Sequence, residues 1–275
     1  MTPTASSGNE SEAPAATRPL WRSVAIPTEH GGWGLTLEPV LLGLLLAASW
    51  AGAAVGVAAF LAFLVRTPLK LALVDRRRHR SLPRTALATK IAVAELITIA
   101  GLATFALFTA GWDWLVPVAA ALPLVAVELW FDVRSRSRRL VPELCGAVGI
   151  AAVAAVIVIA GDSDTRLAVA AWMILAARAI GSIPYVRAQI DRMRHGVGSV
   201  GAADALSGLA LMVAVGATAA DRQVVLGTVA VAALVVFQSV ALRRAHIAPV
   251  KVIGLRQMAA GIAVVAATAI GASLW

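Results

Sequence analysis

The chain has 275 residues, of which 60% are hydrophobic and only 14% are charged, whereas a soluble domain carries roughly 25% charged residues. A water-soluble fold of this length has too little interior to bury so much apolar surface. The composition therefore excludes a soluble globular protein and predicts an all-α, polytopic membrane protein. The net charge of +9 does not indicate nucleic acid, because the basic residues concentrate in a few loops between apolar runs.

The first 17 residues, MTPTASSGNESEAPAAT, are small and polar and include two prolines. They have no basic start and no apolar core, so we expect a disordered tail rather than a secretory signal. We expect residues 18–275 to form the transmembrane helical domain. The single cysteine, Cys145, excludes an internal disulfide, and its apolar surroundings favour a small buried side chain.

Apolar runs of roughly 17 to 25 residues are typical of membrane-spanning helices. The sequence contains nine such runs, and the main alternative is eight spans, because the first run is short and lies close to the second. The predicted spans are residues 34–50, 53–74, 86–109, 113–131, 143–160, 166–186, 201–219, 223–242 and 252–274.

The connections between these spans alternate in charge. One set is long and basic, and includes DRRRHRSLPR (75–84) and DVRSRSRR (132–139), whereas in the other set Arg166 and Arg222 are the only cations. The excess of Lys and Arg in one set of loops predicts that these loops face the cytoplasm. We therefore predict a protein of the inner (cytoplasmic) membrane with a cytoplasmic N-terminus and, for nine spans, an outside C-terminus. Membrane lipids are the expected partners of the basic loops.

Titratable groups lie at the start of the first span and within it. Glu29 and His30 precede a glycine pair, and Glu38 follows inside the apolar run. The chain contains no HxxxH or CxxC spacing, so these residues do not predict a metal site. We expect them to form the first wall of a polar chamber that opens to the cytoplasm, with Glu38 facing arginines of later spans.

The second and sixth spans contain cations. Arg66 lies nine residues before Asp75 at the membrane edge, a depth of about 13 Å along a helix, and Lys70 shares its face. Arg178 lies nine residues before Arg187 in the same way. A charge near the bilayer centre costs roughly 2.5–3.5 kcal/mol on insertion scales, so such groups are usually paired or functional.

After Arg178, polar residues recur at steps of three and four, which predicts one polar stripe on a helix. The residues of this stripe are Ser182, Tyr185, Gln189 and Arg192. The carboxylates available as partners for the cations are Glu38, Glu95, Glu128, Glu143 and Asp204. Two interpretations remain open: the charges hold the helices together, or they line a chamber, cationic toward its middle, that suits a phosphate or carboxylate head.

Three segments carry a resemblance to a known family. The stretches PTEHGGWGLTLEPVLLGLLL, RTPLKLALVDRRRHRSLPRT and AARAIGSIPYVRAQIDR resemble the YwiC-like family of bacterial membrane proteins. The resemblance extends from about residue 20 to the end of the chain. It implies a membrane protein and supplies no biochemical activity.

The chain also resembles, more distantly, the UbiA-type intramembrane prenyltransferases. LPRTALATK and ELWFDVRSRSRRLVPELCGAVG are similar to segments that follow helix 2 and helix 4 of those enzymes. This resemblance implies nine helices, a chamber open to the cytoplasm, and Mg²⁺ held by aspartates in the loops after helices 2 and 6. Those loops here contain one aspartate each, Asp75 and Asp191, and one carboxylate per loop is few for Mg²⁺.

Two functions follow as alternatives. In the first, a UbiA-like enzyme acts on an isoprenoid or other lipid phosphate, with Asp75 and Asp191 contributing any Mg²⁺. In the second, the protein binds or transports a small anion or a quinone-like lipid without reaction. In both, the expected ligand-binding residues are Glu29, His30, Glu38, Arg66, Lys70, Arg178, Tyr185 and Arg187. A third alternative is a membrane scaffold whose charges serve packing alone.

Overall fold

The computed structural model describes residues 20–25, 30–80, 82–134, 139–196, 198, 200–244 and 249–275. The regular elements in these ranges are helices: α1 (Leu20–Ala25), α2 (His30–Leu46), α3 (Trp50–Arg77), α4 (Pro83–Ala110), α5 (Leu115–Val133), α6 (Leu140–Ala160), α7 (Thr165–His195), α8 (Val200–Ala220), the 3₁₀ turn η1 (Arg222–Val224), α9 (Val225–Arg243) and α10 (Val250–Ser273). The tail predicted to be disordered, residues 1–17, lies outside the described residues.

Eight of the described helices, α3 to α10, are long and apolar enough to cross a membrane. The protein is therefore a multi-pass membrane protein, as its composition predicts. Helix α2 is apolar but has 17 residues, about 25 Å at the helical rise, so the choice between eight and nine spans depends on this helix. The orientation of the termini and the identity of the membrane stay predictions.

The predicted span boundaries agree with the helices to within a few residues, apart from a long extension of α7 and a shift of the first span. The first span was predicted at residues 34–50, whereas α2 ends at Leu46 and Trp50 begins α3. The reason is Ser49, whose hydroxyl accepts a hydrogen bond from the backbone N–H of Gly52 (2.9 Å). This bond caps α3 and starts it three residues earlier than hydropathy alone indicates.

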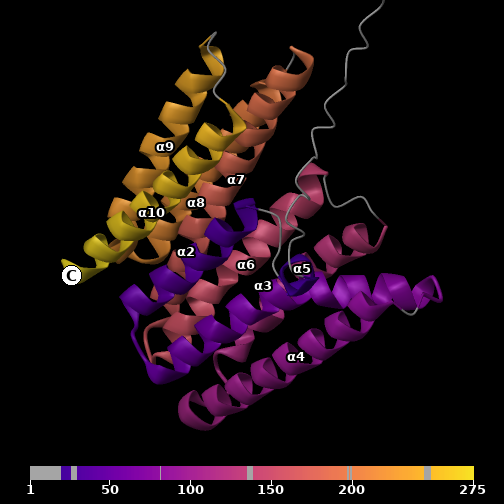
Figure 1. Ribbon diagram of the computed structural model, residues 1–275. Helices are drawn as coiled ribbons and strands as arrows, with labels where there is room; N and C mark the ends of the chain where they lie inside the picture. The colour runs from indigo at the N-terminus through magenta and orange to yellow at the C-terminus, as the bar shows by residue number, and fades with distance from the viewer. Residues whose placement is uncertain are drawn as a thin grey trace, which may run out of the picture.

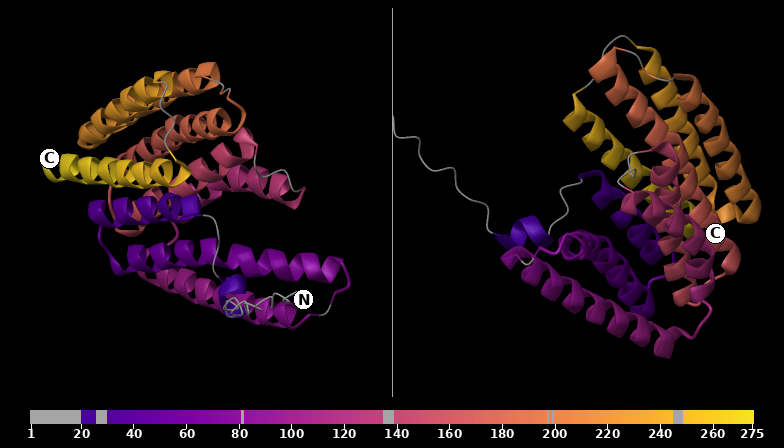
Figure 2. Two further views of the ribbon diagram at one scale, coloured as in Figure 1. Left: turned by 45° about the horizontal axis from the view of Figure 1, so that its top comes forward. Right: turned by 90° about the vertical axis from the view of Figure 1, so that its right-hand side faces the viewer.

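The helices form layers that follow one another across the molecule. Figures 1 and 2 show α3 and α4 as a pair on one side, α8 and α9 on the opposite side, and α2, α6, α7 and α10 between them. Helix α7 is the most buried of the spanning helices and contacts α2, α6, α8, α9 and α10. The α3–α4 pair is inclined to α7–α9 (Figure 1).

From α3 onward, consecutive helices alternate in direction, so that α3, α5, α7 and α9 end toward the same side of the bundle (Figure 1). Their last turns and caps carry Arg76 and Arg77, Arg134, Arg192 and Arg243. We call this end the basic side and the opposite end the cation-poor side. The basic loops therefore lie at one end of the bundle, and the loops with few cations lie at the other end.

On the cation-poor side, small residues let α2, α3 and α6 pack closely. A methyl group on Gly43 of α2 or on Gly52 of α3 would lie within 3.0 Å of the Ile157 side chain of α6. Ile157 is fully buried and belongs to a cluster with Ala51, Val55 and other residues. Such close contacts between small residues are the usual basis of helix association in membranes.

Candidate functional site

A buried ion pair joins α2 to α7. Arg178 Nη2 lies 2.9 Å from Glu38 Oε1, and the two side chains are only 6% and 5% exposed. Glu38 is the central residue of α2, with eight residues on either side. Arg178 Nη2 also donates a hydrogen bond to the backbone carbonyl of Gln257 in α10 (2.8 Å). The predicted contact of Glu38 with an arginine of the sixth span is therefore present in the structure.

A glycine makes room for this pair. Gly261 is near the middle of α10, and a methyl group on it would overlap the Glu38 carboxylate and crowd Arg178 Nη2. Helix α10 can therefore cover the pair only while residue 261 has no side chain. The pair is closed off by α2, α7 and α10 together, which explains its burial.

The polar stripe predicted on α7 continues from this pair toward the basic side. Gln238 of α9 donates a hydrogen bond to Ser182 (3.0 Å), and Gln189 donates one to the hydroxyl of Tyr185 (3.4 Å). Ser182, Gln189, Tyr185 and Gln238 are all buried. The stripe therefore lies in the helix interface and is not an open surface.

Several atoms of this region have no hydrogen-bond partner among the described residues. They are Arg178 Nε, Gln238 Oε1, Gln189 Oε1 and Glu38 Oε1, each with almost no exposed area; Glu38 Oε1 lies 2.9 Å from Arg178 Nη2 as an ion pair but without hydrogen-bond geometry. Buried polar atoms are nearly always bonded. A further small polar group could therefore form hydrogen bonds with these atoms.

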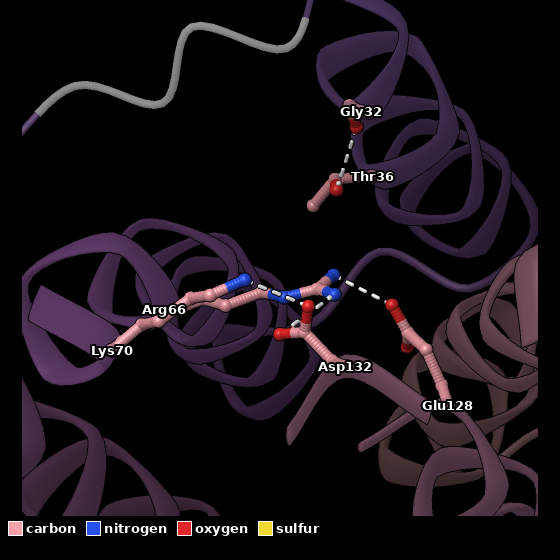
Figure 3. A network of polar contacts seen from close by, with 6 residues as sticks. All are labelled: Gly32, Thr36, Arg66, Lys70, Glu128 and Asp132. Carbon is pink, nitrogen blue, oxygen red and sulfur yellow. Dashed lines mark hydrogen bonds and ion pairs between the residues drawn. The ribbon is translucent and has the colours of Figure 1, made fainter. Parts of the chain in front are cut away.

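A second cluster joins α3 to α5 (Figure 3). Arg66 Nη1 lies 2.6 Å from Glu128 Oε1, and Arg66 Nη2 lies 3.5 Å from Asp132 Oδ2. Lys70 Nζ donates a hydrogen bond to Asp132 Oδ1 (2.8 Å). We call these four residues the α3–α5 cluster. Its two cations and two carboxylates balance in charge.

The members of the α3–α5 cluster differ in exposure. The side chains of Arg66 and Lys70 are 38% and 56% exposed, whereas those of Glu128 and Asp132 are 22% and 11% exposed. Glu128 is held against α6, where a methyl group on Gly146 would overlap its carboxylate. The carboxylates thus form the inner wall of the cluster, and the cations are its accessible part.

The cluster lies near the end of α5 on the basic side. Asp132 is the penultimate residue of that helix. Trp130 and Arg134 lie two residues before and after it, and the Arg134 guanidinium stacks on the Trp130 ring, 3.5 Å from the ring centroid. Tryptophan is enriched at the interface between hydrocarbon and head groups, and an arginine side chain extends toward the head groups from such a position. The sequence predicts Arg66 about 13 Å from the membrane edge, and this depth stays a prediction. In the structure its partner Asp132 lies at the end of α5, and α3 is inclined to the bundle (Figure 1).

The structure corrects the prediction of one chamber shared by both arginines. Arg178 pairs with Glu38 of α2, whereas Arg66 pairs with Glu128 and Asp132 of α5. Each guanidinium has carboxylates of its own, so the cationic character expected from the sequence is neutralised locally. Asp132 was not among the predicted partners, although its spacing of four from Glu128 puts both on one face of α5.

The other predicted ligand-binding residues have separate positions. Arg187 of α7 pairs with Glu143 of α6 (2.8 Å), and both side chains are about one-third exposed. Tyr185 is buried. Glu29 lies outside the described residues, and of His30 only the backbone, which begins α2, is described.

The two aspartates expected to hold Mg²⁺ do different things. Asp75 is buried and accepts hydrogen bonds from Arg84 Nε and Nη2 (both 3.2 Å) and from the Thr85 hydroxyl (2.7 Å). These bonds join the end of α3 to the start of α4. Asp191 is exposed on α7. In the described part of the chain, no three His, Cys, Asp or Glu side chains form a group that could hold a metal ion.

Two further predicted carboxylates can be placed. Asp204 pairs with Arg243 of α9 (2.9 Å), so it joins α8 to α9. Glu95 is near the middle of α4, and its Oε2 has no hydrogen-bond partner among the described residues. The sequence alone does not predict which of these carboxylates is paired, because it does not show which helices are neighbours.

Comparison with known proteins gives one match. Residues 26–158 match the family model described as YwiC-like protein, which confirms the first resemblance for this part of the chain. The segment AARAIGSIPYVRAQIDR follows residue 158 and lies outside the match. No curated protein and no solved structure matches the chain. The resemblance to UbiA-type prenyltransferases therefore stays a prediction.

Proposed function

We propose that this chain, whose residues 26–158 match the YwiC-like family model, binds the phosphate head group of a membrane lipid at the α3–α5 cluster without transforming it. The observation that carries this proposal is the position of Arg66 and Lys70. Both cations are partly exposed next to the end of α5, where Trp130 and Arg134 indicate the head-group level.

Lys70 is the residue best placed to contact a ligand. Its ammonium has three N–H donors, and among the described residues it donates one hydrogen bond, to Asp132. More than half of the side chain is exposed. A phosphate oxygen can therefore bind Lys70 while the contacts of Arg66 to Glu128 and Asp132 are kept.

The charge balance of the cluster limits the ligand. Two carboxylates already neutralise the two cations, so an anion gains attraction mainly from the basic residues around the cluster, such as Arg134, Arg76 and Arg77. That rim attracts anionic head groups by about 1 kcal/mol per residue. A lipid, whose chains stay in the bilayer, reaches this position more readily than a free anion does.

The enzymatic alternative has less support from the geometry. A magnesium-dependent prenyl transfer needs carboxylates that are free to hold the ion. Asp75 instead accepts three hydrogen bonds from Arg84 and Thr85, and Asp191 is not grouped with other ligands among the described residues. Membranes containing the protein should incorporate no labelled prenyl diphosphate into lipid; incorporation that depends on Asp75 or Asp191 would favour the enzyme.

The experiment measures lipid binding to the purified full chain by native mass spectrometry. Two lipids are titrated separately, phosphatidic acid and a C20 isoprenyl monophosphate, to separate the two sources of a phosphate head. Lys70→Gln should weaken binding by about fivefold, the loss of one cation near the surface, and Lys70→Arg should restore it. Lys251→Gln is the control, because Lys251 is exposed on the basic side outside the cluster. Equal weakening by Lys70→Gln and Lys251→Gln would refute a specific site.

A further inference from the structure

The opposite end of the protein carries a surface groove that the α3–α5 cluster does not involve. Its volume is about 480 Å³, and it lies where α8, η1 and α9 meet the end of α10. This is the cation-poor side of the bundle. The lining residues are Val215, Thr218, Ala219, Arg222, Val225, Thr228 and Trp275.

The walls of the groove present an apolar surface, although two threonines line them. The hydroxyls of Thr218 and Thr228 bond to each other (2.7 Å), and that of Thr228 also bonds to the Ala214 carbonyl (2.7 Å). These hydroxyls are thus satisfied within the protein, and they leave methyl groups to line the groove beside Val215 and Val225. Such a surface at the level of a bilayer accepts hydrocarbon.

One cation lies at the rim of this apolar groove. Arg222 is exposed and, among the described residues, forms no ion pair. The neighbouring Asp221 accepts the backbone N–H of Gln223 (2.9 Å) and so caps η1. Trp275, 75% exposed, also lines the groove; tryptophan is enriched at the interface between hydrocarbon and head groups.

We propose that this groove binds a phospholipid, with one acyl chain against Val215 and Val225 and the phosphate on Arg222. An arginine binds a phosphate through two parallel N–H donors. A free phosphate ion would leave the apolar walls uncovered, so the occupant is a lipid. The site is independent of the lipid site proposed on the basic side.

The test is photo-crosslinking of the full chain, reconstituted in nanodiscs, with phosphatidylglycerol that carries a diazirine in one acyl chain. Labelled peptides are mapped by mass spectrometry. In the wild-type protein, labelling should concentrate on residues 215–228. Arg222→Gln should reduce this labelling by about fivefold, as expected for the loss of one cation near the surface. Lys70→Gln should leave it unchanged, which separates this site from the basic side.

Two matched controls make the result decisive. Arg166→Gln removes the other arginine of the cation-poor side, which does not line the groove, and should leave labelling intact. Ala219→Trp should fill the groove and abolish labelling, whereas Ala119→Trp, at an exposed position near the start of α5, should not. Labelling spread evenly over the lipid-facing helices, or equal loss in Arg166→Gln and Arg222→Gln, would overturn the proposal and show surrounding bilayer lipid only.

Discussion

Glu38 and Arg178 form an ion pair of 2.9 Å between α2 and α7, with both side chains more than nine-tenths buried. Removing one partner of a buried pair leaves the other charge without compensation, which typically costs 3–5 kcal/mol. The pair is therefore expected to contribute to the packing of α2 against α7, beside the apolar contacts of Leu42.

Glu38→Gln should lower the free energy of unfolding by about 3 kcal/mol. The double variant Glu38→Gln/Arg178→Gln should be less destabilised than the sum of the single variants, because the cycle removes both charges. Thermal unfolding in detergent, followed by tryptophan fluorescence, measures both effects. Glu143→Gln is the control: its pair with Arg187 is about one-third exposed, so the cost should stay below about 1 kcal/mol. Additive single variants would show that the pair is not coupled.

Two glycines of α10 provide a second prediction. Gly261→Ala should lower the unfolding temperature, because the new methyl group overlaps the Glu38 carboxylate. Gly254→Ala lies on the same helix with nothing within 4 Å. It should leave the unfolding temperature unchanged or raise it, because alanine favours a helix over glycine by about 1 kcal/mol. If both variants behave alike in the same unfolding assay, α10 does not cover the pair as described.

Asp75 should behave as a structural residue. Asp75→Asn removes the charge that binds Arg84 and Thr85 and should destabilise the α3–α4 connection. Asp191→Asn, at an exposed position, should have no such effect. Unfolding temperatures are measured with and without Mg²⁺. A Mg²⁺-dependent stabilisation that disappears in either variant would restore the metal prediction.

Glu95 and Glu128 should respond in opposite ways to the same change. Glu95 Oε2 has no hydrogen-bond partner among the described residues, so Glu95→Leu should raise stability by removing a costly carboxyl group from an apolar helix. Glu128→Leu should lower it, because Arg66 loses its 2.6 Å contact. The unfolding temperatures of the two variants decide this, and a fall for Glu95→Leu would point to a partner of Glu95 in the membrane.

The sequence predicts much of the fold because hydropathy and charge act locally. The apolar runs give nearly all helix positions, and the arginine-rich loops give the two ends of the bundle. The spacing of polar residues along one helix is also a local pattern, so the sequence predicts the stripe from Arg178 to Gln189. The shift of the first span shows the limit: one serine, Ser49, caps α3 and moves a boundary that hydropathy places elsewhere.

Pairing between helices was only partly predictable. The partners Glu38 and Glu128 were named as candidates, but which cation each would meet depends on helix packing. Arg66 and Arg178 lie at equivalent distances from the ends of their predicted spans, yet Arg66 pairs with α5 and Arg178 pairs with α2. No local pattern in the sequence encodes that difference.

We propose that a lipid phosphate binds at the α3–α5 cluster. A cryo-EM map of the protein in nanodiscs that contain phosphatidic acid tests it most directly. We expect density for a head group within hydrogen-bond distance of Lys70 Nζ, which is absent in Lys70→Gln and present in Lys251→Gln. A well-resolved map in which ordered lipids surround the protein but leave Lys70 without a head group would contradict it.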